Sequence, residues 1–264
     1  MSFIAQAITW INVVTNGLGS FLLAPVMVLD GWLSNTIVSA VAGVVLLIIF
    51  KYTSNQRAIG RVRDNIKAHM LALKLFKDSM SVTLQAQGQV FKGAFLLLVH
   101  AVRPMLVMIV PLALLLSQMG LWYQSRPLMV GEESVVAMKL SSDIEQPWPN
   151  VDVESMPGAE VTIGPVRVLS KREVYWKIKA LQSGYHRITF QAGGKQVEKE
   201  LAIGNEFMRV SAERPGWRWG DILLHPAEKP FSPDSVVQSI SIDYPDRSSQ
   251  FFGIPLWLVY FFVA

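Results

Sequence analysis

Two long, apolar stretches without charge constrain the fold of this chain more than any other feature. Residues 31–50 and 104–123 each supply twenty residues without a charged side chain. At a rise of about 1.5 Å per residue, a helix of this length crosses roughly 30 Å of hydrocarbon. The whole chain is 51% hydrophobic with a mean hydropathy of +0.34, which is high for a soluble domain. The sequence therefore predicts an α-helical membrane protein with polar appendages.

The distribution of charge predicts the orientation. Segment 51–103 holds nine Lys and Arg residues against two Asp and Glu, whereas segment 124–250 holds fifteen against seventeen. Excess Lys and Arg marks the cytoplasmic side of a membrane. We therefore expect a multi-pass protein of the cell (plasma) membrane with residues 51–92 in the cytoplasm and its N-terminus outside. Nucleic-acid binding is the alternative for the basic block, but its flanks are apolar spans, so no DNA partner is expected.

The N-terminal half is expected to be helical throughout. Residues 1–30 predict an uncharged interfacial helix and a lead-in on the outer face, followed by the first span at 31–50. The second span is expected at residues 93–123. Pro104 and Pro111 should bend this helix or remove some of its backbone hydrogen bonds. Trp32 and Tyr123 stand where interfacial aromatic residues belong.

Between the spans, residues 51–92 form a basic arm. Apolar residues recur at steps of three and four, which predicts one long helix or a helical hairpin with a break near residues 78–81 or Gly88. A solvated coiled coil is one interpretation, and an arm that meets a ribosome or a nascent chain is the other. The cations that define the arm are Arg57, Arg61, Arg63, Lys67, Lys74 and Lys77.

The chain changes character after the second span. Residues 124–215 contain seven short β-type runs separated by turn-forming residues, which predicts an extracytoplasmic, all-β sandwich of immunoglobulin-like type. Residues 216–250 predict a tether with one further strand. Residues 251–264 are apolar but too few to cross, so we expect the start of a third, truncated span; a short tail in the interface is the alternative.

No pattern in the sequence predicts an enzyme, a metal site or a cofactor. The chain has no cysteine, which excludes a thiol nucleophile and a cysteine-based zinc site. Its four histidines, His69, His100, His186 and His225, are far apart without ligand spacing. Nucleotide-binding glycine loops and a G-x-S-x-G motif are absent.

The N-terminal half resembles a known family. Three runs are similar to insertases of the YidC/Oxa superfamily. They are "INVVTNGLGSFLLAPV", "KYTSNQRAIGRVRDNIKAHM" and "RPMLVMIVPLALL". The similarity is greatest to archaeal insertase-like proteins related to the third subunit of the endoplasmic reticulum membrane protein complex. It covers residues 10–123 and extends to 251–264. The family's outer loop is normally short, whereas about 125 residues fill that place here.

The resemblance implies three spans around a polar groove that is open to the cytoplasm and to lipid. Arg103 would then face the wet groove, which removes most of the cost of placing an arginine in hydrocarbon. Asn35, Thr36 and Ser39 would line the groove higher up. His100 is a groove candidate or an interfacial residue, and Arg103 is a groove residue or a topology anchor that reaches the lipid phosphates.

These observations predict an insertase or membrane chaperone that gives hydrophobic segments a polar path into the bilayer. Its partners would be membrane lipids and client membrane proteins or nascent chains. The alternative is a non-catalytic scaffold or assembly subunit whose β domain binds other membrane subunits or an exported protein.

Overall fold

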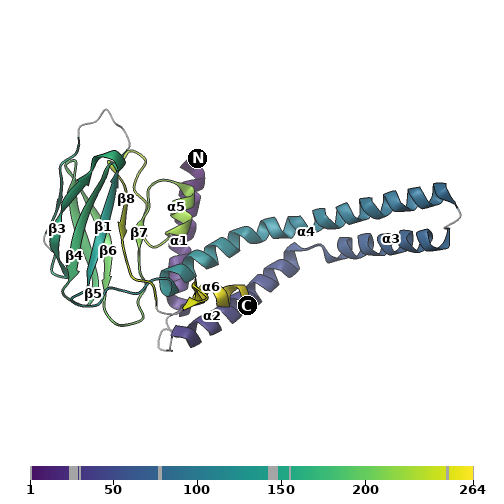
Figure 1. The fold of residues 1–264 in the computed structure, drawn as a ribbon, viewed down its shortest axis with the longest axis horizontal. Helices are drawn as coiled ribbons and strands as arrows, with labels where there is room; N and C mark the ends of the chain where they lie inside the picture. The colour runs from purple at the N-terminus through teal and green to yellow at the C-terminus, as the bar shows by residue number, and fades with distance from the viewer. Residues whose placement is uncertain are drawn as a thin grey trace. The chain divides into compact units, whose positions relative to one another are not determined.

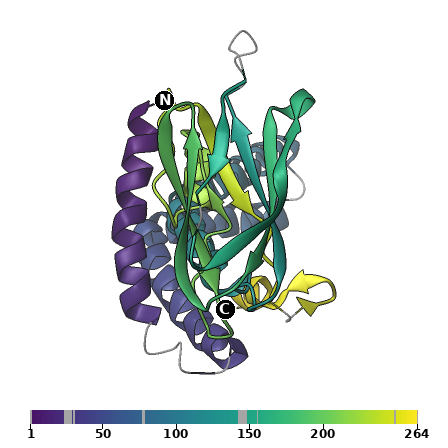
Figure 2. The same cartoon turned by 90° about the vertical axis from the view of Figure 1, so that its left-hand side faces the viewer.

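The computed structural model describes residues 2–23, 29, 31–76, 79–141, 148–154, 156–247 and 250–263. Two compact units make up the chain. The first, here the β unit, joins Met1–Ala40 to Ala113–Ala264, and the second, the hairpin unit, is Val41–Leu112. Figures 1 and 2 show the elements of both units as ribbons.

Two helices are long and apolar enough to cross a membrane, as the sequence predicts. They are α2, Gly31–Thr53, and α4, Met80–Tyr123. Only 6% of the most apolar window of α4 is buried, which is unlike the core helix of a soluble domain. Helix α4 continues through Pro104 and Pro111. Because proline lacks an N–H group, the carbonyls four residues earlier lose their usual donors.

Helix α1, Ser2–Leu23, has two unlike faces. Ala5 and Asn12 are buried, whereas Phe3, Trp10 and Phe21 are highly exposed. Large apolar side chains on an exposed helix face are typical of a membrane or protein contact.

The basic arm is a helical hairpin within the hairpin unit. Helix α3 runs from Gln56 to Leu75, and α4 begins at Met80, so the break falls beside the expected one at residues 78–81 while Gly88 lies inside α4. The Asn55 side chain accepts a hydrogen bond from the Ala58 N–H at 3.1 Å and thereby caps α3.

The two arms of the hairpin approach closely at Gly93. A Cβ atom at this position would lie 2.4 Å from Ile66 Cγ1 of α3, which is closer than such atoms approach in practice. The absence of a side chain at Gly93 therefore sets how near α3 and α4 pack.

Antiparallel sheets form the core of the β unit. A five-stranded sheet has the order β3-β4-β1-β8-β7, a three-stranded sheet has the order β2-β5-β6, and a small ladder pairs β9 with β10. The strands are β1 Glu133–Leu140, β2 Val151–Val153, β3 Ala159–Val168, β4 Glu173–Ala180, β5 Gly184–Ala192, β6 Lys195–Ile203, β7 Glu213–Arg214, β8 Val237–Ile242, β9 Gln250–Phe251 and β10 Ile254–Pro255.

The two larger sheets share one hydrophobic core. Side chains of β4 alternate between half-exposed and buried, as period-two patterning requires. Trp176 on β4 meets Phe190 on β5 with ring centroids 5.1 Å apart, so the inner faces of the two sheets pack together. Figure 2 shows the strands of the β unit with α1, in purple, along one flank.

Residues 216–250, for which the sequence suggested a tether with one further strand, are part of the β unit. They supply helix α5, Trp219–Leu224, and strand β8, which pairs with β1 in the larger sheet. Phe231 and Ile240 from this segment lie in the core. Beyond it, the apolar residues Leu256–Val263 form helix α6.

We predict that Gly93→Ala loosens the hairpin, although alanine favours a helix over glycine by about 1 kcal/mol. Overpacking against Ile66 costs roughly 1–3 kcal/mol, so the net effect is a loss of stability. Trypsin cleavage within α3 of the purified chain should accelerate severalfold. Gly88→Ala is the matched control, because nothing lies within 4 Å of a Cβ there. Equal cleavage rates for the two variants would contradict the prediction.

Candidate functional site

The outer half of α2 carries a buried polar face. Ser34, Asn35 and Ser39 are each 3% exposed or less. Ser34 Oγ and the Tyr123 hydroxyl of α4 are 2.6 Å apart, which joins the ends of the two long helices within the β unit. Thr36 lies on the exposed side of α2 and donates to the Trp32 carbonyl at 2.8 Å. The sequence candidates on α2 thus separate into two buried residues and one exposed residue.

Two polar atoms on this buried face lack hydrogen-bond partners. Among the described residues, Asn35 Oδ1 and Ser39 Oγ have none. An unsatisfied buried polar group costs roughly 1–3 kcal/mol, so natural proteins usually pair such groups. The two residues are four apart and share one side of the helix. They form a polar stripe on a helix that is otherwise apolar enough to span a membrane.

The other two groove candidates lie on α4 in the hairpin unit. Arg103 is exposed and makes no ion pair within the described part of the chain. His100, one turn earlier, donates from Nδ1 to the Leu96 carbonyl at 2.7 Å. Because Pro104 has no N–H group, the carbonyl of His100 loses its regular helical donor. Arg103 therefore lies next to the point where the regular hydrogen-bond ladder of α4 is interrupted.

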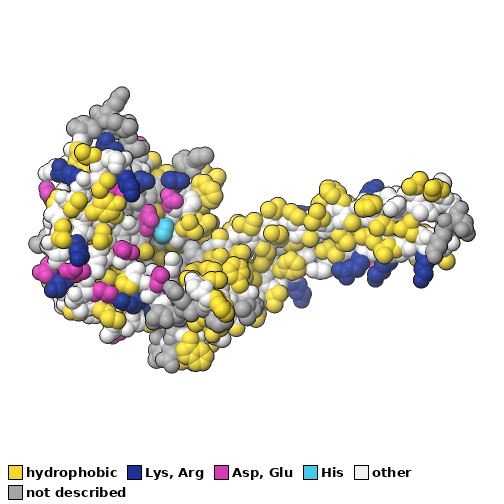
Figure 3. Space-filling view, in the orientation of Figure 1, with side chains coloured by type: hydrophobic (Ala, Val, Ile, Leu, Met, Phe, Trp, Pro, Cys, Tyr) yellow, Lys and Arg dark blue, Asp and Glu magenta, His cyan; other side chains and the backbone are white. Residues whose placement is uncertain are grey.

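The cations of the basic arm remain in solvent. Within α3, the single acidic residue, Asp64, lies 3.8 Å from Lys67 Nζ, and both side chains are well exposed. Such a pair contributes little, so the positive charge of α3 is almost uncompensated. Figure 3 shows the Lys and Arg side chains along α3 and mainly hydrophobic side chains on the visible face of α4. The exposed arm cations are Arg57, Arg61, Arg63, Lys67 and Lys74, and Lys77 lies outside the described residues.

Hydrogen bonds from two asparagines attach α1 to the rest of the β unit. Asn12 Nδ2 donates to the Ile222 carbonyl of α5 at 2.7 Å, and Asn16 Nδ2 donates to the Pro226 carbonyl, also at 2.7 Å. Gln118 Nε2 of α4 donates to Asn16 Oδ1 at 2.7 Å. Asn16 therefore links α1, α4 and the loop after α5.

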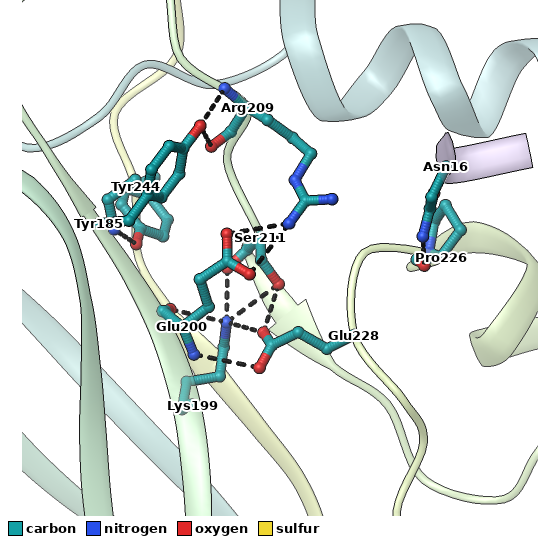
Figure 4. A network of polar contacts seen from close by, with 10 residues as sticks. Asn16, Tyr185, Lys199, Glu200, Arg209, Ser211, Pro226, Glu228 and Tyr244 are labelled. Atoms are coloured by element: carbon teal, nitrogen blue, oxygen red, sulfur yellow. Dashed lines mark hydrogen bonds and ion pairs between the residues drawn. The ribbon is translucent and has the colours of Figure 1, made fainter. Parts of the chain in front are cut away.

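The same loop is anchored to the sheet by a buried ion pair. Lys199 of β6 is 0% exposed, and its Nζ lies 2.6 Å from Glu228 Oε1. Nζ also donates to the Ser211 carbonyl at 2.6 Å, and Glu228 Oε2 accepts from the Glu200 N–H at 3.0 Å. Burial lowers the pKa of Lys199, and the Glu228 carboxylate opposes that shift. Figure 4 shows this network beside the Asn16–Pro226 contact.

Ser211 and Lys199 are close together, but their surroundings do not form an open catalytic pair. A lysine activates a serine only if its amine is neutral and the hydroxyl can reach a substrate. Here the Ser211 hydroxyl hydrogen-bonds to Glu228, and both Ser211 and Lys199 are buried. The geometry supports a structural anchor. Within the described ranges, no group of three or more His, Cys, Asp or Glu residues could hold a metal ion.

A cavity of about 330 Å³ opens beside the polar stripe within the β unit. Asn35 and Trp32 of α2, Tyr123 of α4, Trp257 of α6 and Arg247 are among its lining residues. The cavity thus combines two amides, two guanidiniums, one carboxylate and two indole rings, and its lining includes residues at the ends of the two long helices.

Sequence reasoning did not identify Lys199, Arg247 or the asparagines of α1 as important. Some signals were present. Lys199 lies on the same inward face of β6 as Leu201 and Ile203. Asn12 and Asn16 stand one turn apart in an apolar helix. Arg247 carries no such signal, because only the fold brings it to the cavity that Tyr123 and Trp257 also line.

Comparisons with known proteins add little to this description. No protein-family description matches the sequence, and no curated protein matches it. Among solved structures, the chain is similar to domains 4 and 5 of the S-layer protein SbsC at 18% identity with a TM-score of 0.24. That match covers 31% of this chain and 47% of the S-layer chain.

We predict that Lys199→Met destabilises the β unit by about 3–5 kcal/mol, because the Glu228 carboxylate would stay buried without its cation. Urea unfolding of the full chain in detergent, followed by tryptophan fluorescence, measures the change. Adding Glu228→Gln should restore much of the loss. Arg187→Met is the control, since Arg187 and Glu198 form an exposed pair at 3.0 Å that should contribute under about 1 kcal/mol. A loss below about 1 kcal/mol for Lys199→Met would refute the anchor role.

Proposed function

We propose that this chain is a membrane-embedded insertase or chaperone that offers hydrophobic client segments a polar path into the bilayer. The observation that carries the proposal is the polar stripe of Asn35 and Ser39, whose buried oxygens have no partners in the described part of the chain. Polar side chains in a span usually face protein or water, and mark a functional path. A client segment with polar atoms would supply the missing hydrogen bonds.

The membrane setting is supported by the two long apolar helices. Helix α4 is apolar, 44 residues long and almost unburied along its most apolar window. Large exposed apolar faces are rare on soluble monomers and mark membrane or protein contacts. In the proposed topology, the exposed cations of α3 lie in the cytoplasm and attract anionic ribosomal RNA or lipid.

In this proposal, the positive charge of Arg103 attracts acidic segments of the client. The Arg103 guanidinium is exposed and makes no ion pair within the described part of the chain, so its charge is free to act on a client. It would draw in the acidic outer segment of a client before the hydrophobic segment enters the bilayer. No bond is broken in such a process, because the protein acts by lowering the barrier for moving polar groups across hydrocarbon.

The β unit has a different part in the proposal. We infer an extracytoplasmic, immunoglobulin-like module that is attached to α1 through Asn12 and Asn16, and Asn16 in turn accepts from Gln118 near the end of α4. Its well-packed core also suits the alternative function, an anchored scaffold that binds an exported protein.

We predict that Ser39→Val raises stability and lowers insertion at the same time. Removing an unsatisfied buried hydroxyl should stabilise the fold by about 1 kcal/mol, whereas a path without that hydroxyl offers clients one polar contact fewer. Thermal unfolding and insertion of a single-span client into proteoliposomes measure the two effects. Thr36→Val is the matched control on the exposed side of α2 and should change neither. Undiminished insertion by a stabilised Ser39→Val variant would exclude the stripe from the path.

We predict that Arg103→Glu reduces insertion several-fold for clients with acidic outer tails and has less effect on clients with neutral tails. The reversed charge would repel acidic segments instead of attracting them. The same reconstituted assay, run at low and at high salt, isolates the electrostatic part. Lys92→Glu, another exposed cation of α4, is the control. Full activity of Arg103→Glu on acidic clients would remove the groove role and favour the scaffold function.

A further inference from the structure

Arg247 brings a positive charge to the cavity and forms no ion pair in the described part of the chain, although Glu206 also lines the cavity. Its guanidinium lies over the Phe207 ring, 4.3 Å from the centroid, and Nη2 donates to the Met208 carbonyl at 3.1 Å. Within the described ranges, no Asp or Glu lies within ion-pair distance of it. Burial lowers the pKa of this guanidinium, which nonetheless stays protonated at neutral pH.

The second arginine of the cavity is already neutralised. Arg126 donates two hydrogen bonds to Glu132, at 2.8 and 2.9 Å, in a bidentate pair. The contrast assigns the uncompensated charge to Arg247. A guanidinium held on an aromatic face with free donor capacity is well suited to a phosphate or carboxylate.

Three enclosed atoms beneath the cavity surface lack partners among the described residues. Arg247 Nε and Trp257 Nε1 are donors, and Asn35 Oδ1 is an acceptor. A ligand that satisfies all three must present anionic oxygens together with a hydroxyl or ammonium donor. Phosphodiester headgroups such as phosphoglycerol and phosphoethanolamine have this combination.

The position of the cavity at the ends of the long helices also favours a phosphodiester headgroup as its ligand. Trp32 lies in the first turn of α2 and Tyr123 ends α4, so both cavity residues mark the ends of helices long enough to span. Aromatic side chains at helix ends sit at the level of lipid headgroups. The N-terminal turn of α2 adds the partial positive charge that favours anions. This step relies on the membrane setting of the proposed function.

We propose that the Arg247 cavity binds the phosphodiester headgroup of a phospholipid, with Arg247 and Trp257 toward the phosphate and Asn35 toward a hydroxyl or ammonium group. The volume of about 330 Å³ is at the lower end of the range for small-molecule sites, which suits a headgroup and not a whole lipid. The acyl chains would lie outside along the exposed apolar faces of the helices.

Native mass spectrometry of the full chain in neutral detergent tests the proposal. Phosphatidylglycerol is titrated in, and the dissociation constant is obtained from the bound fraction. Arg247→Met should weaken binding about tenfold or more, because a charge-assisted hydrogen bond is lost. Arg172→Met is the matched control, since Arg172 also lies over an aromatic ring, Trp148, at 5.9 Å but lines a different cavity. Unchanged affinity of Arg247→Met would overturn the proposal.

Soluble glycerophosphoglycerol distinguishes the sources of the headgroup. If millimolar glycerophosphoglycerol displaces the lipid, the site also accepts free phosphodiesters. If the lipid stays bound, the site requires the headgroup as part of a membrane lipid. If Arg247→Met does not fold, Asn35→Val and Trp257→Phe replace it, and each should weaken binding several-fold without loss of charge. Wild-type affinity in both would overturn the proposal.

The lipid measurement is independent of insertion. Binding in detergent requires no client, so an inactive Arg103→Glu variant that still binds phosphatidylglycerol would leave this site in place. Conversely, normal insertion by an Arg247→Met variant that loses the lipid would leave the insertase proposal in place. The two proposals therefore fail separately.

Discussion

The hydrogen bonds of Lys199 hold together much of the β unit. This lysine is buried on an inward-facing position of β6, and the Glu228 carboxylate makes that burial tolerable. Glu228 in turn fixes the loop whose Pro226 carbonyl receives Asn16 of α1. Gln118 of α4 reaches the same asparagine. The ion pair thus lies close to the contacts that join α1 and the end of α4 to the loop, and removal of either partner would leave an unpaired buried charge.

The same cost of burying polar groups makes the polar stripe informative. Lys199 is buried and fully paired, whereas Asn35 and Ser39 are buried with unpaired oxygens in the described part of the chain. Paired polar groups specify a structure, and unpaired ones persist where a function keeps them. The proposed function rests on this difference, with a structural anchor in the β sheets and the proposed path on α2. The Arg247 cavity shares Asn35 with the stripe, so lipid and client would compete for one amide.

Much of the fold could be predicted because it depends on local pattern. The uncharged run at 31–50 became α2, the break beside residues 78–81 became the hairpin turn, and alternating β4 residues became a half-buried strand. Residues 216–250 were harder: one further strand was expected there, but its pairing with β1 and the burial of Phe231 in the core depend on contacts with distant segments. Of the site, Asn35 and Ser39 were predictable because polar residues are conspicuous in a span. Arg247 was not, because the cavity residues around it come from distant parts of the sequence.

The sequence by itself determined which segments could enter a membrane and where positive charge would gather, because helix length, hydropathy and charge are properties of neighbouring residues. It also determined the period-two pattern that sheets require. Only the tertiary structure decided which polar atoms would be paired. Hydrogen bonds reach about 3 Å, so the pairing of Lys199 with Glu228 and the unpaired state of Asn35 among the described residues depend on contacts between segments far apart along the chain.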